Sequence, residues 1–309
     1  MTAILEAHDL GRWYGDVVGL SDLTLTLDSG VVGLLGPNGA GKSTFLKLVV
    51  GELRPSRGTL RVLGHEPFAN QELFRRLGFA PQQDALWGDL TALEMVAFLL
   101  QLSGFSRGAA RDRAVRALER VKLHDAMERK TRGYSKGMRQ RVRIAQAIAH
   151  DPELLVLDEP LTGLDPLARR DTLDLLAELA RSGTSLLVSS HVLHEVEELT
   201  HDVVLLHRGR LLAKGAAAEI RALLDQRPRR VEFFARDNRK LARALLDLEG
   251  TLSVRIGPDG KLAVETNDLD GLQIALPAIT ARERPGVRAF EIVDTSLEAL
   301  FDDLVGGVA

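Results

Sequence analysis

Early in the chain, leucine alternates with polar residues, and short runs that are mostly apolar follow. Residues 23–28 alternate Leu with Thr and Asp, which is the period-two pattern of a strand with one solvent-facing side. Residues 31–35 are continuously apolar, and residues 154–157 and 185–188 are similar runs. Short runs of this kind are typical of strands buried on both faces. Because each run precedes a helical pattern, the sequence predicts strand–helix units around a parallel sheet.

A helix-rich stretch and a hairpin complete the first part of the chain. The helical patterns occupy residues 91–150. Arg208-Gly209 separates the apolar runs 203–206 and 211–212, which predicts a hairpin turn between two strands. We therefore expect residues 1–222 to form one large α/β domain.

A smaller α+β domain is predicted for residues 231–309. Its pattern has the order βαββαβ, which is typical of a ferredoxin-like sandwich. Residues 223–230, which contain Pro228 and several charges, are predicted to be a linker. The expected elements are strands at 231–235, 252–256, 262–265 and 287–292, helices at 239–248, 269–279 and 296–305, and a turn at 258–260.

Composition excludes several classes of protein. The length of 309 residues suits one large and one small domain. A net charge of -3 argues against a nucleic-acid-binding protein. The absence of cysteine excludes disulfides, thiolate metal sites and cysteine nucleophiles. Apolar runs fall short of the roughly 18 residues of a membrane span, and no signal-peptide pattern is visible, so we expect any membrane role to require a partner.

A phosphate-binding motif occupies residues 36–43, which read Gly-Pro-Asn-Gly-Ala-Gly-Lys-Ser and match the P-loop pattern G-x-x-x-x-G-K-[ST]. The motif follows an apolar strand and precedes a helix, whose positive dipole end favours phosphate. Glycines 39 and 41 let the backbone turn its N–H groups toward phosphate oxygens. Lys42 would lie between the β- and γ-phosphates, and the Ser43 hydroxyl would bind Mg²⁺. The predicted nucleotide-binding residues here are Gly36, Pro37, Asn38, Gly39, Ala40, Gly41, Lys42, Ser43 and Thr44.

Two adjacent carboxylates, Asp158 and Glu159, follow the apolar run at 154–157. They would lie at the carboxyl edge of the sheet, where α/β proteins bind ligands. In that position Asp158 would hold Mg²⁺ directly or through water, and Glu159 would polarise the attacking water. Taken alone, these residues could equally form a surface turn after a strand.

Residues 134–141 read Tyr-Ser-Lys-Gly-Met-Arg-Gln-Arg and resemble the signature segment of the ATP-binding cassette (ABC) ATPases. That segment is usually Leu-Ser-Gly-Gly-Gln followed by Gln-Arg. Ser135 and Gly137 match this form, whereas Tyr134, Lys136 and Met138 depart from it. Lys136 either adds a charge at the nucleotide or faces water.

Shorter motifs extend the resemblance over residues 4 to about 222 in the family order. Gln82 resembles the Q-loop glutamine, although the adjacent Gln83 could be mistaken for it. Asp165 lies in Gly163-Leu164-Asp165, which resembles the D-loop, and His191 resembles the switch histidine. Tyr14 resembles the aromatic residue that stacks on adenine, and Trp13 is a rival for that position.

The resemblance implies a P-loop NTPase cassette that binds ATP and Mg²⁺. Its fold combines a parallel-core sheet, an antiparallel β subdomain and a helical subdomain. Catalysis is assigned to Glu159, His191 and Gln82. Mg²⁺ is assigned to Ser43, Gln82 and Asp158, and the nucleotide contacts outside the P-loop are assigned to Tyr14, Ser135, Gly137 and Asp165.

The resemblance also implies partners. In the family, two subunits enclose two ATP molecules between the P-loop of one and the signature segment of the other, which implies a head-to-tail homodimer. The Tyr-Ser-Lys-Gly-Met signature and residues 295–301 resemble a bacterial exporter branch, in which the ATPase is a separate chain with a C-terminal extension. The implied partners are integral membrane permease subunits, and the implied location is peripheral, at the cytoplasmic face of the cell membrane.

Two other functions remain open from the sequence. One is a cassette ATPase that acts on a soluble assembly, such as a DNA-repair, ribosome or cluster-assembly complex. The DNA-repair type has a long coiled-coil insertion and the ribosome type has two cassettes per chain, and neither pattern is found here. The other is a non-enzymatic, nucleotide-dependent scaffold, against which the intact Asp158, Glu159 and His191 argue.

Overall fold

The computed structural model describes residues 3–83, 86–219, 229–257 and 260–293, and it divides into two compact units. Unit 1 comprises residues 1–217 and unit 2 comprises residues 218–309. Most of the predicted linker lies outside the described residues. Its last two residues, Arg229 and Arg230, differ from the prediction because they begin a strand of unit 2.

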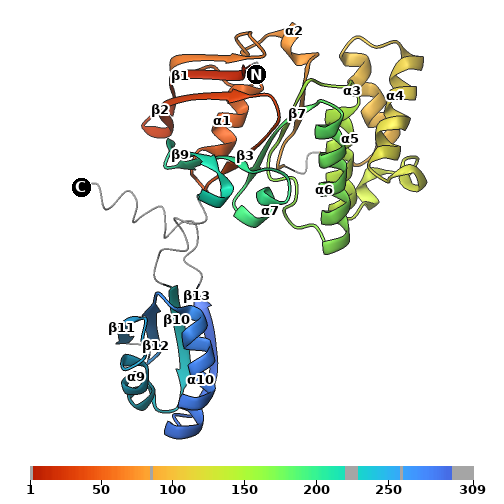
Figure 1. Ribbon diagram of the computed structural model, residues 1–309. Helices are drawn as coiled ribbons and strands as arrows, with labels where there is room; N and C mark the ends of the chain where they lie inside the picture. The colour runs from red at the N-terminus through yellow and green to blue at the C-terminus, as the bar shows by residue number, and fades with distance from the viewer. Residues whose placement is uncertain (1–2, 84–85, 220–228, 258–259, 294–309) are drawn as a thin grey trace. The chain divides into compact units, whose positions relative to one another are not determined.

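A six-stranded sheet forms the centre of unit 1, with the strand order β5-β6-β7-β3-β8-β9 (Figure 1). Neighbouring strands from β5 to β8 are parallel, and β9 is antiparallel to β8, as the hairpin pattern predicted. All side chains of β6 and β7 are buried, which explains why β6 is continuously apolar and why β7 has an apolar centre, Leu186 to Val188, between buried serines. The strands are β3 (Val31–Leu35), β5 (Leu77–Ala80), β6 (Leu154–Leu157), β7 (Ser185–Ser190), β8 (Asp202–His207) and β9 (Arg210–Ala216).

A three-stranded antiparallel sheet, in the order β2-β1-β4, accompanies the central sheet. The strands are β1 (Ala3–Tyr14), β2 (Val17–Asp28) and β4 (Arg57–Val62). The predicted alternation in β2 is confirmed, since Leu23, Leu25 and Leu27 are buried and the polar residues between them are exposed. These leucines share one core with Phe45 of helix α1 (Lys42–Val49), so the helix that follows the P-loop is fixed between the two sheets.

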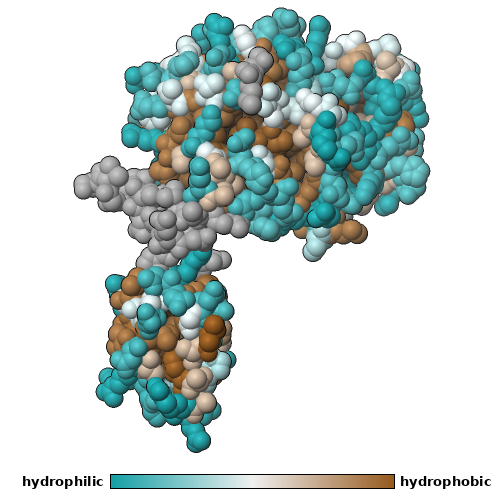
Figure 2. Space-filling model, viewed as in Figure 1, coloured by the Kyte–Doolittle hydropathy of each residue, from teal (hydrophilic) through white to brown (hydrophobic). Residues whose placement is uncertain are grey.

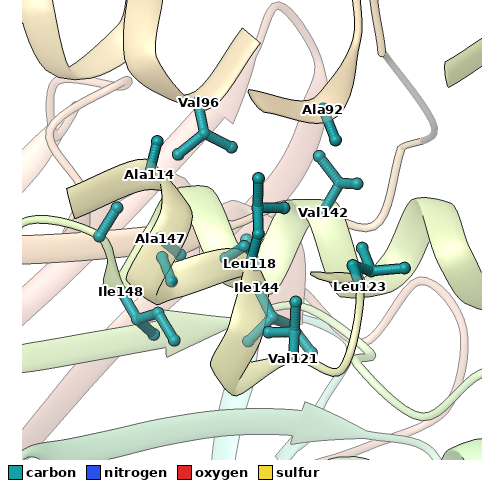
Figure 3. Close-up of a cluster of buried hydrophobic side chains, with 14 of the residues drawn as sticks. Ala92, Val96, Ala114, Leu118, Val121, Leu123, Val142, Ile144, Ala147 and Ile148 are labelled. Carbon is teal, nitrogen blue, oxygen red and sulfur yellow. The ribbon is translucent and has the colours of Figure 1, made fainter. Parts of the chain in front are cut away.

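Three helices between β5 and β6 form the helical subdomain (Figure 3). Their buried faces meet through small and branched residues, such as Ala114 and Leu118 of α4 and Val142 of α5. The side chain of Thr91 and that of Glu94 form a reciprocal capping box at the start of α3. The helices are α3 (Ala92–Leu102), α4 (Arg107–Arg120) and α5 (Lys136–Ile148), with short 3-10 turns at His124–Ala126 and Thr131–Gly133.

Helix α5 crosses strand β5 at very close range. A Cβ atom at Gly78 would overlap the carbonyl oxygen of Ala147, so only glycine allows this approach. The same helix borders α6, and hydrophilic residues cover the surface over α5 and α6 in Figure 2. The remaining helices of unit 1 are α2 (Gln71–Phe74), α6 (Pro166–Arg181) and α7 (Leu193–Glu197).

Unit 2 is a four-stranded antiparallel sheet, in the order β11-β12-β10-β13, with two helices packed on one face. The chain order βαββαβ and this strand order are those of a ferredoxin-like sandwich, as predicted. Val231 and Phe233 of the central strand are fully buried against the helices. The elements are β10 (Arg229–Ala235), α9 (Asn238–Leu246), β11 (Thr251–Ile256), β12 (Leu262–Thr266), α10 (Leu269–Glu283) and β13 (Val287–Val293), and the predicted helix at 296–305 lies outside the described residues.

Candidate active site

The P-loop lies between β3 and the start of α1, as its sequence context predicted. Gly41 has a φ of +100°, and a Cβ atom on it would lie 2.6 Å from the carbonyl oxygen of Gly19. Gly39 has a φ of +79°, so both glycines lie in the left-handed region that other residues rarely adopt. The loop therefore turns tightly before α1, and the N-terminus of that helix adds its dipole to the site.

Lys42 turns its ammonium group into the loop. The residue is only 6% exposed, and its Nζ donates hydrogen bonds to the carbonyl oxygens of Gly36 (2.6 Å) and Pro37 (3.2 Å). The same Nζ lies 3.5 Å from Oε1 of Glu159. A buried cation inside a loop of backbone N–H groups is a site for a phosphate chain.

Asp158 and Glu159 follow β6 and are anchored by Ser189 of the neighbouring β7. The Ser189 hydroxyl donates to Oδ1 of Asp158 (2.6 Å) and accepts from the backbone N–H of Glu159 (2.9 Å). Both carboxylate residues are buried, at 5% and 8% exposure. Sequence reasoning missed Ser189, although the pairing of two parallel strands would place it beside Asp158.

Three polar side chains surround the Glu159 carboxylate. Its Oε2 accepts from the Thr162 hydroxyl (2.9 Å) and from Nε2 of Gln82 (3.4 Å), and it lies 3.1 Å from Nδ1 of His191. Burial raises the pKa of Glu159, but the Thr162 hydrogen bond and the charges of His191 and Lys42 outweigh burial and lower the pKa below its usual value. Glu159 is therefore held as a carboxylate, the form that accepts a proton.

Residues from four separate motifs thus converge at the carboxyl edge of the central sheet. Gln82 follows β5, Glu159 follows β6, and His191 follows β7, and these three strands are adjacent. Lys42 comes from the helix after β3, the next strand. Thr162 was not predicted, since a threonine after a carboxylate motif has no pattern of its own.

Tyr14 and Trp13 occupy different environments. Tyr14 is 43% exposed, and its ring lies beside Gly19 and Thr44, next to the P-loop helix. Trp13 folds back over Gly11 of its own strand. Tyr14 therefore offers an exposed aromatic face near the phosphate site, whereas the indole of Trp13 covers backbone.

The signature and D-loop residues form a second group at the starts of α5 and α6. The Ser135 hydroxyl caps α5 by accepting from the backbone N–H of Met138 (3.2 Å), and Asp165 caps α6 by accepting from that of Ala168 (2.9 Å). Gly137 adjoins Leu164 and Ala168. In Figure 1, strands β3 and β7 separate α5 from the P-loop helix α1. The two groups of predicted residues are therefore distinct in one chain.

Two departures in the signature segment have structural roles. Tyr134 is 4% exposed, and its hydroxyl donates to the carbonyl oxygen of Ala126 (2.6 Å). Burial also raises the pKa of the Tyr134 hydroxyl, so the neutral donor is retained. The exposed Lys136 extends across Gly163 of the D-loop, and its chain fills the space that a side chain there would need.

The residues predicted to bind Mg²⁺ fit that ion chemically. Asp158 uses Oδ1 to accept from Ser189, and a carboxylate has a second oxygen available for a cation. Ser43 and Gln82 add a hydroxyl and an amide oxygen, and hard oxygen donors suit Mg²⁺. Within the described residues no group of three His, Cys, Asp or Glu could hold a metal.

Comparisons with known proteins agree with this geometry. The family model described as ABC transporter matches residues 20–162. The daunorubicin/doxorubicin resistance ATP-binding protein DrrA of Streptomyces peucetius is 33% identical over 309 residues, which cover 99% of this chain and 93% of that protein. The chain belongs to the ATP-binding proteins of ABC transporters. The bacitracin transport ATP-binding protein BcrA of Enterococcus faecalis is 31% identical and covers 99% of this chain and 98% of its own length.

Solved structures place the fold of this ABC transporter ATP-binding protein in the same family. An ATP-binding subunit of an ABC transporter has a TM-score of 0.64 at 33% identity and covers 71% of this chain and 92% of its own. The dimeric bacterial cassette MJ0796 has a TM-score of 0.64 at 25% identity and covers 69% and 98%. The protein is therefore an ATPase of the ABC type. In the described parts of the chain, no helix has the length and apolar character that a bilayer span needs.

Proposed function

We propose that two copies of this ABC transporter ATP-binding protein enclose two Mg²⁺·ATP molecules and couple hydrolysis to export by separate membrane subunits. The observation that carries this proposal is the division of the predicted ATP contacts into two groups within one chain. The hydrolytic group surrounds Lys42 and Glu159, and the group around Ser135 and Gly137 lies at the start of α5, beyond β3 and β7 (Figure 1). A second copy in head-to-tail orientation brings its signature group to the phosphates held by the first.

Within the site, different residues bind the nucleotide and act in hydrolysis. Lys42 and the P-loop N–H groups bind the phosphates, and Tyr14 stacks on the base. Ser43, Asp158 and Gln82 would hold Mg²⁺, which would supply positive charge that neutralises the phosphates. Glu159 accepts the proton of the attacking water, and His191 orients that water and the γ-phosphate. The signature residues of the partner copy, Ser135 and Gly137, close the site and exclude bulk water.

The proposal assigns the membrane subunits to a surface beside the Q-loop. Trp87 and Phe98 form an edge-to-face pair with ring centroids 5.7 Å apart, and they are 46% and 45% exposed. The backbone carbonyl of Trp87 accepts from the buried Thr131 hydroxyl (2.9 Å), which fixes the pair on the helical subdomain. Exposed, rigid aromatic residues are typical anchors of protein interfaces. Trp87 is five residues from Gln82 along the chain, so we expect a partner bound at this pair to influence the Q-loop.

Charge supports a location at the inner membrane face. Residues 91–150 contain thirteen Lys or Arg and five Asp or Glu, an excess of eight positive charges in a chain whose net charge is -3. The cytoplasmic leaflet of cell membranes is anionic, and each Lys or Arg near it contributes about 1 kcal/mol of attraction. A permease that binds the aromatic pair holds this basic subdomain near the membrane.

Recovery of the membrane subunits tests the transport proposal. We expect the tagged protein, purified from detergent-solubilised membranes of its native host, to retain an integral membrane protein. Trp87→Asp places a charge on the aromatic pair and is expected to lower this recovery at least about tenfold, since an interface anchor contributes about 2 kcal/mol or more.

The matched control is Phe68→Asp, which adds the same charge to another aromatic residue with 47% exposure, in unit 1 but outside the helical subdomain. Equal recovery with Trp87→Asp and Phe68→Asp would show that the aromatic pair does not bind the membrane subunits. Absence of any integral membrane protein from the wild-type preparation would contradict the transport role.

A further inference from the structure

We infer that Arg143 is a positioning residue for ATP hydrolysis, which fixes the Q-loop so that Gln82 reaches Glu159. The inference rests on the proposed role of Gln82 in the site. Arg143 belongs to α5, the helix whose first turn carries the signature residues Ser135 and Gly137. Arg143 therefore connects helix α5, whose first turn is proposed to close the partner's site, to the Q-loop, which carries Gln82 of the chain's own site.

The contacts of Arg143 are made inside the protein. The residue is 4% exposed, and its Nη1 donates to the backbone carbonyl oxygens of Pro81 (2.8 Å) and Gln82 (2.5 Å). Its Nη2 donates to Oε1 of Gln140, which is also buried, one turn earlier on the same helix. The guanidinium thus holds the Q-loop by the two backbone carbonyls that flank the α-carbon of Gln82.

The side chain of Gln82 connects this backbone to the Glu159 carboxylate. It donates from Nε2 to Oε2 of Glu159 at 3.4 Å, a long hydrogen bond that a small displacement would break. Arg143 holds Gln82 by its backbone, and the Gln82 side chain contacts Glu159, so we expect the effect of Arg143 on hydrolysis to pass through Gln82. This separates a positioning role from a catalytic one.

The chain around Arg143 leaves little freedom for the loop to adjust. Helix α5 contacts β5, the strand that leads into the Q-loop. The contact is closest where Gly78 meets Ala147, a position that has no room for a side chain on Gly78. With 1.5 Å of rise per residue, Arg143 lies about 12 Å along the helix from Ser135. We expect a shift of the first turn of this helix to reach the Q-loop carbonyls through Arg143.

Arginine suits this position better than other donors. Its planar guanidinium presents several N–H groups in a fixed fork, so one side chain can hold two carbonyls and an amide oxygen together. Methionine fills a similar volume but donates no hydrogen bond, and it leaves the two carbonyls without this donor. Lysine keeps the charge but donates from a single nitrogen atom, so we expect its effect on hydrolysis to lie between those of arginine and methionine.

We expect Arg143→Met to lower the kcat for ATP hydrolysis about 10- to 100-fold, the range for displacing a group at a reacting centre by up to about 1 Å. The affinity for ATP is expected to stay within about threefold of the wild type, because the P-loop and Tyr14 do not depend on Arg143, and threefold is below 1 kcal/mol. Arg143→Lys is expected to recover part of the lost kcat.

A double-mutant cycle with Gln82→Ala distinguishes positioning from loss of stability. If Arg143 acts through Gln82, adding Arg143→Met to Gln82→Ala lowers kcat no further. If kcat of the double variant falls below that of Gln82→Ala by the full factor seen for Arg143→Met alone, the inference is overturned. Unchanged kcat in Gln82→Ala alone contradicts the proposed role of Gln82, whereas a decrease in Gln82→Ala without one in Arg143→Met contradicts only the role of Arg143.

Hydrogen–deuterium exchange supplies a readout that does not depend on activity. In nucleotide-free protein, Arg143→Met is expected to speed exchange in peptides that cover residues 78–83 while α3 and α4 exchange as in the wild type. The matched control is Arg113→Met, which removes another arginine that donates to a backbone carbonyl, that of Ala149, in the same subdomain. Faster exchange throughout the subdomain, or equal effects of both variants on the Q-loop, overturns the inference.

Discussion

Glu159→Gln is expected to lower the rate of ATP hydrolysis about 10²- to 10⁴-fold while ATP binding is retained, which is the range for loss of a general base. The substitution keeps the size of the side chain and an oxygen that can accept from Thr162. It removes the carboxylate charge that His191 and Lys42 stabilise in the wild type. Glutamine cannot accept the proton of the attacking water, so only the chemical step is lost.

Phosphate release from purified protein measures this prediction, with nucleotide binding measured separately. The matched control is Glu153→Gln, which removes a carboxylate from the residue before β6, at the opposite end of that strand, where it pairs with Arg76 on the surface. That control is expected to hydrolyse ATP at the wild-type rate. Wild-type turnover in Glu159→Gln would remove Glu159 from the role of general base.

The second large effect is expected from Lys42→Met, which should weaken ATP binding about 30-fold or more. Loss of one partner from a buried, hydrogen-bonded charge interaction costs about 2–5 kcal/mol, and 1.4 kcal/mol is a factor of ten. Lys42 is the buried cation of the P-loop, so methionine fills its space without binding phosphate. The variant also loses the hydrogen bonds to Gly36 and Pro37, which reduces the order of the loop.

Titration with a fluorescent ATP analogue checks this effect, and Lys47→Met is the matched control. Lys47 lies on the same helix, but its side chain is 39% exposed and pairs with Glu52 outside the site. We expect normal affinity in the control and an unchanged melting temperature in both variants to within a few degrees. Equal affinities in the two variants would mean that Lys42 does not contact the phosphates.

The sequence predicted the parts of the fold that have strong local patterns. Residues 31–35 and 154–157 are strands because wholly apolar runs must be buried on both faces. β5 was missed because its four residues, Leu77–Ala80, include Gly78 and are too short for a clear period. β1 was also missed, since several register shifts interrupt its alternation.

The motifs named residues that the structure brings together, whereas residues that meet them only through strand pairing or helix packing were missed. The P-loop pattern identified Lys42, and the structure places its ammonium beside Glu159. Ser189 and Arg143 follow no short motif, because their partners are Asp158 and the Q-loop carbonyls, which are distant in sequence. Such contacts depend on strand order and helix packing, which one sequence does not specify.

The signature segment shows a third limit of prediction from one sequence. Its sequence left open whether Lys136 faces water or a nucleotide, and the structure shows only that its chain crosses Gly163. In the proposed head-to-tail dimer, the role of that lysine depends on the partner copy. One chain shows the signature residues only as the start of helix α5, and the function proposed for them requires a second chain.

Sedimentation of Glu159→Gln with saturating Mg²⁺·ATP tests the central claim most directly. Because this variant is expected to bind ATP and hydrolyse it very slowly, the proposed closed form should accumulate, and we expect a dimer that returns to monomer when ADP replaces ATP. A bulky substitution at the signature, Gly137→Trp, is expected to prevent the dimer in the same assay. A species that stays strictly monomeric at high protein concentration, alone and beside its membrane partner, would contradict the head-to-tail account.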